Sequence, residues 1–189
     1  TQKEYVHTVS ASGETLLNLI NDILDFSKIQ ADRIELESKT FDLEQVVCSL
    51  LDLFARQAED SGNTLSYRVE PGFKPVMKGD ITRVRQILNN LLANAVKFTS
   101  HGDVCVVMGP HPDDPSSVDV AIRDTGIGIK PGRMADLFSP FMQEDSSTTR
   151  RYGGSGMGLV ISKGLVDIMG GRLGVESVLG RGSVFTVTL

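Results

Sequence analysis

The stretch DITRVRQILNNLLANAVKFT, Asp80 to Thr99, decides the fold because two patterns run along it together. Its apolar residues recur at intervals of three and four, which predicts a long helix packed against a core, with Asp80 as its cap. The apolar set is Ile81, Val84, Ile87, Leu88, Leu91, Leu92, Ala95 and Val96. Asn90, Asn94 and Lys97 fall at i, i+4 and i+7, so a polar line shares one face of that helix. Two amides and an ammonium suit an oxyanion and a hard cation, although a solvated face is the other interpretation.

Composition limits the class of protein. With 189 residues, 40% of them hydrophobic, the chain can bury one core, and we expect one domain over residues 34–189 after an accessory helix in residues 1–33. The formal net charge of −5 argues against nucleic acid or an anionic membrane as the main partner. Cys48 and Cys105 are interpreted as reduced core residues, and no apolar run could cross a bilayer, so we expect a cytoplasmic chain without direct membrane contact. Patterned sequence reaches both ends, so we expect a piece of a longer protein.

The first part of the chain predicts one long helix, from about Gln2 to Ala31, with a heptad-like apolar seam. The seam is formed by Val6, Val9, Gly13, Leu16, Ile20, Ile23 and Ser27. Such a stripe needs a partner, and we expect another chain or an additional segment to cover it, which makes a homodimer through this helix the favoured arrangement. The alternative is that the helix packs back on the globular domain.

The remaining periodicity predicts an α+β fold, a two-layer sandwich in which helices cover one face of a mixed, mostly antiparallel sheet. Strands are expected in residues 33–43, 64–70, 75–79, 103–110 and 117–125, and two more in 172–189 around a Gly-rich turn. The turn HPDDPSS should join the fourth and fifth of them into a hairpin. Helices are expected from Asp42 to about Ser61, from Pro131 to Phe138 and over residues 158–171, and the polar stretch 143–156 is interpreted as a mobile lid.

Two glycine clusters carry the candidate chemistry. Asp124 ends an alternating strand and precedes Gly126 and Gly128; its carboxylate suits an exocyclic amine such as adenine N6, and the glycines admit a flat ligand that Ile127 and Ile129 could enclose. The other interpretation of DTGIG is a tight turn. The second cluster, GGSGMG at residues 153–158, precedes a helix and follows Arg150 and Arg151, a combination that favours a phosphate, unless it is only a flexible loop.

The order and spacing of these motifs resemble the ATP-binding domain of sensor histidine kinases, most closely the hybrid kinases that carry receiver domains. In that family's terms NNLLANAVKF resembles the N box, DTGIG the G1 box, Phe138 to Phe141 the F box and GGSGMGL the G2 box. TLLNLINDILDFSKIQ, residues 15–30, resembles the second helix of the dimerisation hairpin, and GRGSVFTVTL the usual final strand. The resemblance therefore covers nearly the whole chain.

The resemblance implies specific roles for residues of this chain. Asn94 would coordinate Mg²⁺, Asn90 and Lys97 would face the triphosphate of ATP, and Asp124 would hold the adenine. Asn90, Lys97 and Arg150 would be the catalytic set. The nucleotide would further contact Gly126, Gly128, Ile129, Phe138, Arg150, Gly154, Ser155, Gly156, Met157, Gly158 and Leu159, with Phe141 joining Phe138 in anchoring the lid.

One departure from the family matters. The phosphoacceptor His of the family lies on the first hairpin helix, and none of His7, His101 and His111 has the expected neighbours, so each is interpreted as a solvated surface residue. We therefore expect this chain to bind ATP but to need a His on a helix outside it, with a receiver domain as the next partner. Two alternatives remain: a related ATPase, disfavoured because residues 80–99 contain no Glu to act as general base, and a non-catalytic module that binds nucleotide and forms heterodimers.

Overall fold

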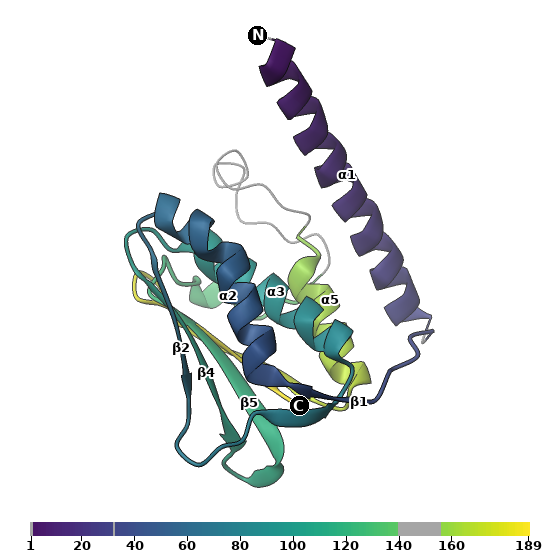
Figure 1. Cartoon of the computed structure of the whole chain (residues 1–189), viewed down its shortest axis with the longest axis vertical. Helices are drawn as coiled ribbons and strands as arrows, with labels where there is room; N and C mark the ends of the chain where they lie inside the picture. Colours follow the sequence, from purple (N-terminus) through teal and green to yellow (C-terminus); the bar gives the residue numbers. More distant parts are fainter. Residues whose placement is uncertain (1, 32, 140–155) are drawn as a thin grey trace.

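The computed structural model describes residues 2–31, 33–139 and 156–189 (Figure 1). In these ranges a long first helix is followed by a sandwich of helices and strands, as the sequence predicts. The helices are α1 (Gln2–Gln30), α2 (Leu43–Asp60), α3 (Ile81–Phe98) and α5 (Gly158–Ile168), with a short 3₁₀ turn η1 (Pro131–Arg133). The strands are β1 (Lys39–Asp42), β2 (Thr64–Val69), β3 (Val76–Gly79), β4 (Asp103–His111), β5 (Asp114–Asp124), β6 (Arg172–Val178) and β7 (Gly182–Thr188).

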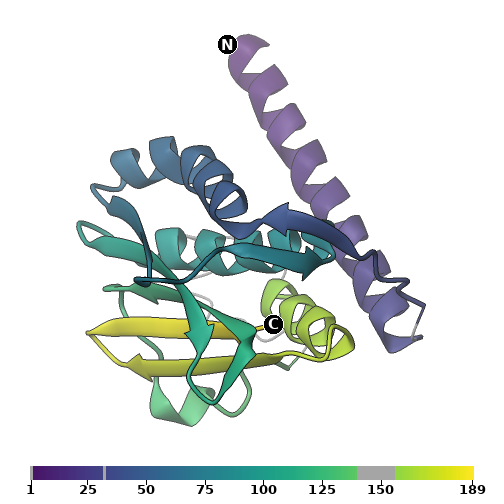
Figure 2. The ribbon, with the colours of Figure 1, turned by 60° about the horizontal axis from the view of Figure 1, so that its bottom comes forward.

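The main sheet has five strands in the order β2-β4-β5-β7-β6. Only β2 and β4 are parallel, and the other three pairs are antiparallel. Helices α2, α3 and α5 lie across one face of this sheet, which Figure 2 shows after the molecule is turned. The predicted α+β class, with a mostly antiparallel sheet and helices on one face, is therefore confirmed.

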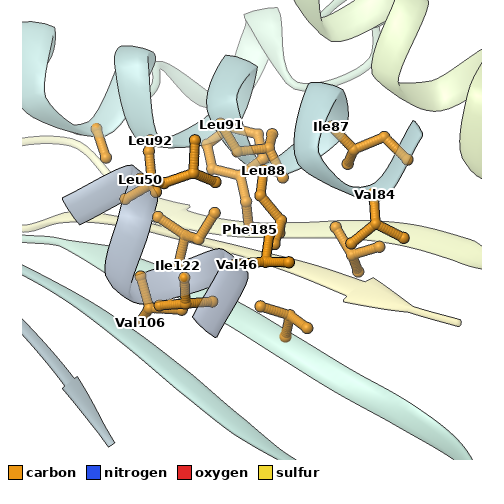
Figure 3. Close-up of a cluster of buried hydrophobic side chains, with 14 of the residues drawn as sticks. Val46, Leu50, Val84, Ile87, Leu88, Leu91, Leu92, Val106, Ile122 and Phe185 are labelled. Atoms are coloured by element: carbon orange, nitrogen blue, oxygen red, sulfur yellow. The ribbon is translucent and has the colours of Figure 1, made fainter. Parts of the chain in front are cut away.

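The apolar side of α3 forms the centre of the core (Figure 3). Val84, Ile87, Leu91 and Leu92 are fully buried, and they face strand residues with the two-residue alternation of a half-buried sheet, such as Ile122 of β5. Truncating a leucine at such a position costs about 2 to 5 kcal/mol of stability, because the cavity is not refilled. The core thus fixes α3 across the sheet, and with it the polar line on the helix.

A two-stranded ribbon, β1 paired antiparallel with β3, places the starts of α2 and α3 side by side. An aspartate at or just after the end of each strand caps the following helix: the side chain of Asp42 accepts hydrogen bonds from the N–H groups of Glu44 and Gln45, and Asp80 accepts from Thr82 and Arg83. Both caps satisfy backbone donors that the first helical turn leaves without partners. The predicted starts of both helices are confirmed.

Helix α1 packs on the globular domain only in part, which is the alternative considered from its sequence. Its C-terminal part packs on the globular domain: the Nε2 of Gln86 donates to the Oδ2 of Asp25 at 2.7 Å, and Ile29 lies against Gly164 of α5, where a Cβ would collide with it. Its central seam stays exposed, with Leu16 at 58%, Ile20 at 45% and Ile23 at 50%. The helix therefore both docks on its own domain and presents an apolar stripe to solvent.

Several predicted details are wrong, for local reasons. Residues 131–138 form a 3₁₀ turn and further turns rather than a helix, because the segment begins with Pro131 and Gly132. The hairpin turn is shorter than HPDDPSS, since a register irregularity after Pro110 lets β4 reach His111 and β5 begin at Asp114. His111 is accordingly half-buried, with its Nδ1 2.9 Å from the Oδ2 of Asp119, and is not a simply solvated residue. The first predicted strand is confined to β1.

The structure also bears on the predictions made for the cysteines, His101, the lid segment and membrane spans. Cys48 and Cys105 are free thiols, each half-buried rather than fully in the core. His101 is exposed in a turn, as predicted, with a positive φ of 51°. The predicted lid lies almost wholly outside the described residues. Among the described helices, none is long and apolar enough to cross a membrane.

Candidate nucleotide-binding site

The polar line on α3 faces the start of α5. Asn90, Asn94 and Lys97 are all half-buried rather than fully solvated. The Nδ2 of Asn90 donates to the backbone oxygen of Gly158 at 3.2 Å and lies 3.3 Å from the Oγ of Ser162. Because this nitrogen is used to hold α5, the atom that Asn90 can offer a ligand is its amide oxygen, which suits a cation better than a phosphate.

Lys97 lies one turn beyond Asn94, at the end of α3. Burial lowers the pKa of its ammonium group below the usual value, and its Nζ lies 4.9 Å from the centroid of the Phe98 ring. Desolvation disfavours the charged form, and a nearby anion would favour it again. A cation whose charge is disfavoured by burial beside a helix terminus is suited to receive a polyphosphate, and such shifts are enriched at functional sites.

Asp124 closes β5 on the side of the sheet that the helices cover. Its Oδ1 accepts the N–H of Gly126 at 2.9 Å and the N–H of Ser183 at 3.2 Å. Burial raises the pKa of this carboxyl, and the two backbone hydrogen bonds only partly oppose that effect. Among the described residues both hydrogen bonds fall on Oδ1, so Oδ2 is the oxygen that remains for a ligand donor.

The glycines after Asp124 are required by close backbone packing. A Cβ on Gly126 would overlap the carbonyl oxygen of Phe98, and Gly128 has a φ of +66° and would overlap the backbone of Val178. The N–H of Ile127 also donates to the Phe98 oxygen at 3.2 Å. The glycine loop is therefore held between the end of α3 and the β6–β7 turn, which brings Asp124 and Lys97 to the same edge of the fold.

The start of α5 forms the third side of the site. Its N-cap residue is Met157, which is buried and supplies no side-chain hydrogen bond to the helix end. The first N–H groups of an uncapped helix point outward and, with the helix dipole, favour an anion. Gly156 turns the chain into this helix with a φ of +69°, and a Cβ on Gly158 would meet the Asn90 side chain at an ordinary van der Waals distance.

The structure thus gathers most of the residues predicted from sequence. Asn90, Asn94, Lys97, Asp124, Gly126, Gly128, Ile129, Gly156, Met157, Gly158 and Leu159 lie on the elements just described, and Phe138 is half-buried against the core. Arg150, Gly154, Ser155 and Phe141 lie outside the described residues. The roles of all these residues in binding stay predictions.

Sequence reasoning missed two serines. Ser162 is completely buried on α5 and meets Asn90, and Ser183 is buried on β7 and donates its backbone N–H to Asp124. A polar residue inside an apolar helical stripe was a usable signal for Ser162, since a buried hydroxyl requires a partner. Ser183 could be assigned only once the pairing of β5 with β7 was known.

Comparison with known proteins identifies the class. Residues 79–189 match the family described as histidine kinase-, DNA gyrase B-, and HSP90-like ATPase. The chain therefore belongs to this ATPase family, and the predicted resemblance is confirmed.

Two curated relatives of the chain are histidine kinases. Hybrid signal transduction histidine kinase L of Dictyostelium discoideum is 39% identical over 191 residues, covering 100% of this chain and 11% of that protein. Signal transduction histidine-protein kinase BarA of Escherichia coli K12 is 38% identical over 187 residues, covering 98% of this chain and 20% of that protein. The chain thus spans only a small part of these relatives.

Solved structures agree with this assignment. Full-length ShkA in complex with AMPPNP superposes with a TM-score of 0.86 at 34% identity, over 99% of this chain and 38% of that one. Histidine kinase ThkA in complex with the response regulator TrrA gives a TM-score of 0.75 over 100% of this chain and 51% of that one; at 23% identity it supports the fold alone.

Proposed function

We propose that this chain is the ATP-binding catalytic domain of a two-component sensor histidine kinase, which binds Mg-ATP and transfers the γ-phosphoryl group to a His on a helix outside these residues, for relay to a receiver Asp. The observation that carries the proposal is the placement of Asp124, whose half-buried carboxyl has a raised pKa and receives both of its backbone hydrogen bonds from the described residues on Oδ1, which leaves Oδ2 for a ligand. The relatives named above are themselves histidine kinases.

Each side of the site would contribute one interaction with ATP. Asp124 Oδ2 would accept a hydrogen bond from the adenine amine, while the glycine loop and Ile129 enclose the ring. Lys97, Arg150 and the N–H groups at the start of α5 would neutralise the phosphates. Phosphoryl transfer needs chiefly in-line positioning and charge neutralisation, so α3 does not have to supply a general base.

The residues present fit a magnesium ion bound together with the nucleotide. Mg²⁺ prefers oxygen ligands and keeps several waters, so an Asn94 amide oxygen plus phosphate oxygens would be a sufficient set. No group of three or more His, Cys, Asp or Glu side chains in the described part of the chain could hold a metal by itself. Bound there, the ion would offset the charge of the phosphates that Lys97 also faces.

Partners outside the chain complete the proposal. The exposed seam of α1, with Leu16, Ile20 and Ile23, would pair with another hairpin helix and with a second subunit, forming a homodimer. A receiver domain would accept the phosphoryl group; ThkA, which shares this fold, is itself bound to the response regulator TrrA. Dependence on Mg-ATP would put the domain on the cytoplasmic side of a sensor.

The test of the transfer step compares this chain with a longer one. After incubation with Mg²⁺ and γ-labelled ATP, the 189-residue chain should carry no label on His, and addition of a hairpin that bears the acceptor His should produce an acid-labile phosphohistidine. Steady release of inorganic phosphate by the isolated chain, without labelling of the added hairpin, would favour the related-ATPase alternative. Absence of any ATP binding would reject both.

The metal assignment has a separate test. Asn94→Ala should weaken binding of ATP about tenfold in the presence of Mg²⁺, the loss of one good ligand or hydrogen bond. In EDTA the same variant should lose less than about twofold, as seen by isothermal titration. Asn89→Ala, one helical step away from the polar line, is the matched control. Equal losses with and without metal would contradict a metal role for Asn94.

A further inference from the structure

A row of three polar residues crosses the sheet at the edge that carries Asp124. In the strand register Asp124 of β5 lies opposite Ser183 of β7, and Ser183 lies opposite Ser177 of β6. Directly opposed residues point to the same face of a sheet, which here is the face covered by helices. Ser177 is thus two strands from Asp124, but it belongs to the same row.

The hydroxyl of Ser177 links its own strand to two other segments, the glycine loop and the start of β7. Its Oγ accepts the N–H of Ile129 at 2.8 Å, lies 3.0 Å from the oxygen of Gly182, and lies 2.9 Å from the Oγ of Ser183. Ile129 ends the glycine loop, and Gly182 begins β7 after the turn. One side chain therefore ties the loop below the proposed adenine pocket to the turn beside it.

The turn is itself packed tightly against Asp124. Gly182 has a φ of +107°, and a Cβ there would overlap the carbonyl oxygen of Asp124. The next N–H, that of Ser183, is the one that donates to Asp124 Oδ1. Any shift of Gly182 would therefore move a donor that sets the orientation of the carboxylate.

Counting donors and acceptors shows what Ser177 controls. A serine hydroxyl has one proton and two lone pairs. Ile129 occupies one lone pair, so the proton is directed to either Gly182 or Ser183. If the Ser177 proton is donated to the Gly182 oxygen, the Ser183 hydroxyl can donate to Ser177 and keep its lone pairs for other donors. If the Ser177 proton is donated to the Ser183 hydroxyl, the Ser183 hydroxyl can donate its own proton to another acceptor. Ser177 therefore sets both the position and the polarity of the groups beside Asp124.

Resting on the proposed function, we propose that Ser177 is a positioning residue for adenine recognition: its hydroxyl locks the glycine loop and the β6–β7 turn so that Asp124 Oδ2 meets the exocyclic amine. Ser177 acts through Ile129 and Ser183 and makes no contact with the nucleotide itself. Its loss should weaken recognition of the amine rather than binding of the triphosphate.

The experiment measures base selectivity. Affinities for Mg-ATP and for Mg-purine riboside triphosphate, which lacks only the exocyclic amine, are compared by titration of the full chain. The native chain should prefer ATP about tenfold or more, the strength of one hydrogen bond to a charged acceptor. In Ser177→Ala this preference should fall to less than about threefold, while the affinity for the purine nucleotide changes less than about twofold.

Conservative variants separate positioning from stability. Ser177→Thr keeps the hydroxyl and should restore the preference, whereas Ser177→Cys keeps the size but accepts hydrogen bonds weakly and should behave like Ser177→Ala. Ser66→Ala, the same change at an exposed site on the opposite edge strand, is the matched control. If Ser177→Ala does not fold, the Thr and Cys variants supply the same comparison.

The outcomes distinguish two failures. An unchanged preference in Ser177→Ala or Ser177→Cys would overturn the role of Ser177 and leave the proposed function in place. Equal losses for both nucleotides would show a merely structural role and would also overturn it. A native chain that binds ATP without preferring it would remove the adenine assignment of Asp124, and a native chain that binds neither nucleotide would remove the proposed function.

Discussion

Asp80 is buried and Asp124 is half-buried, and both carboxylates lie at or just after the end of a strand and accept backbone hydrogen bonds, yet their chemistry differs. Asp80 accepts from three N–H groups, those of Glu37, Thr82 and Arg83. Burial alone would raise its pKa, but these bonds and the charge of Arg83 bring the pKa below the usual value. At Asp124 burial prevails over two bonds and the pKa is raised.

The difference indicates which carboxylate serves the fold and which serves a ligand. Asp80 uses both oxygens inside the protein: Oδ1 caps α3, and Oδ2 holds the segment after α1 through Glu37. Asp124 uses Oδ1 only, among the described residues, and its charge is held in a poorly solvated place. Holding a charge in a poorly solvated place lowers the stability of the fold, and such groups are enriched at sites where a ligand supplies the missing hydrogen bond.

The largest expected effect is on nucleotide binding by Asp124→Asn. The amide keeps an oxygen for Gly126 and Ser183 but places an NH₂ group against the adenine amine, so ATP affinity should fall about 30- to 100-fold, or about 2 to 3 kcal/mol. Isothermal titration with Mg-ATP measures it. Asp80→Asn is the matched control and should change ATP affinity less than about twofold. Undiminished ATP binding in Asp124→Asn would remove the distinction between the two residues.

The next effect is the loss of stability expected when Asp80 is truncated. Asp80→Ala removes a helix cap and leaves the N–H of Glu37 without its acceptor, so the free energy of unfolding should fall by about 2 kcal/mol. Asp42→Ala removes a comparable cap on α2 with only two donors, and should cost about 1 kcal/mol. Urea unfolding followed by circular dichroism measures both. Equal costs would show that the bond to Glu37 contributes nothing.

The same contrast explains how far the sequence could predict the molecule. Asp80 and α3 were predictable because a capping residue and a 3.6-residue apolar period are local signals, and the core then confirms them. Asp124 was predictable because it ends an alternating strand and precedes two glycines. Both signals can be read without knowing where any distant segment lies.

What could not be predicted depends on pairing between distant strands and helices. Ser177 and Ser183 join Asp124 only because β7 lies between β5 and β6, an order that does not follow the chain. The contact of Asn90 with Ser162 likewise requires the packing of α3 on α5. The family resemblance assigned Asn90 to the triphosphate, whereas the structure directs its nitrogen at α5 and leaves its oxygen for a ligand.

The smallest expected effect is an opposite pH dependence of the two carboxylates. The pKa of Asp80 is lowered, so its contribution to stability is present above the ordinary value near 3.8 and is lost as pH falls toward its folded-state pKa. The pKa of Asp124 is raised by folding. Between pH 3.8 and the folded-state pKa of Asp124, the folded state therefore binds more protons than the unfolded state, and stability falls as pH rises. Above the folded-state pKa of Asp124, its carboxylate lowers the free energy of unfolding by an amount that no longer changes with pH.

Asp124→Asn should therefore be at least as stable as the native chain at pH 7, and its advantage should shrink as the pH is lowered toward 4. The effect is small because Asp124 is only half-buried and water screens part of the charge. Urea unfolding of both proteins at several pH values from 4.5 to 7.5, at one ionic strength, measures the difference in free energy. Asp80→Asn should show no trend over this range, since its window lies at lower pH. A stability difference for Asp124→Asn that stays flat over the same range would mean that its carboxyl is solvated, and the site would then lack the stored electrostatic cost that binding of ATP is expected to relieve.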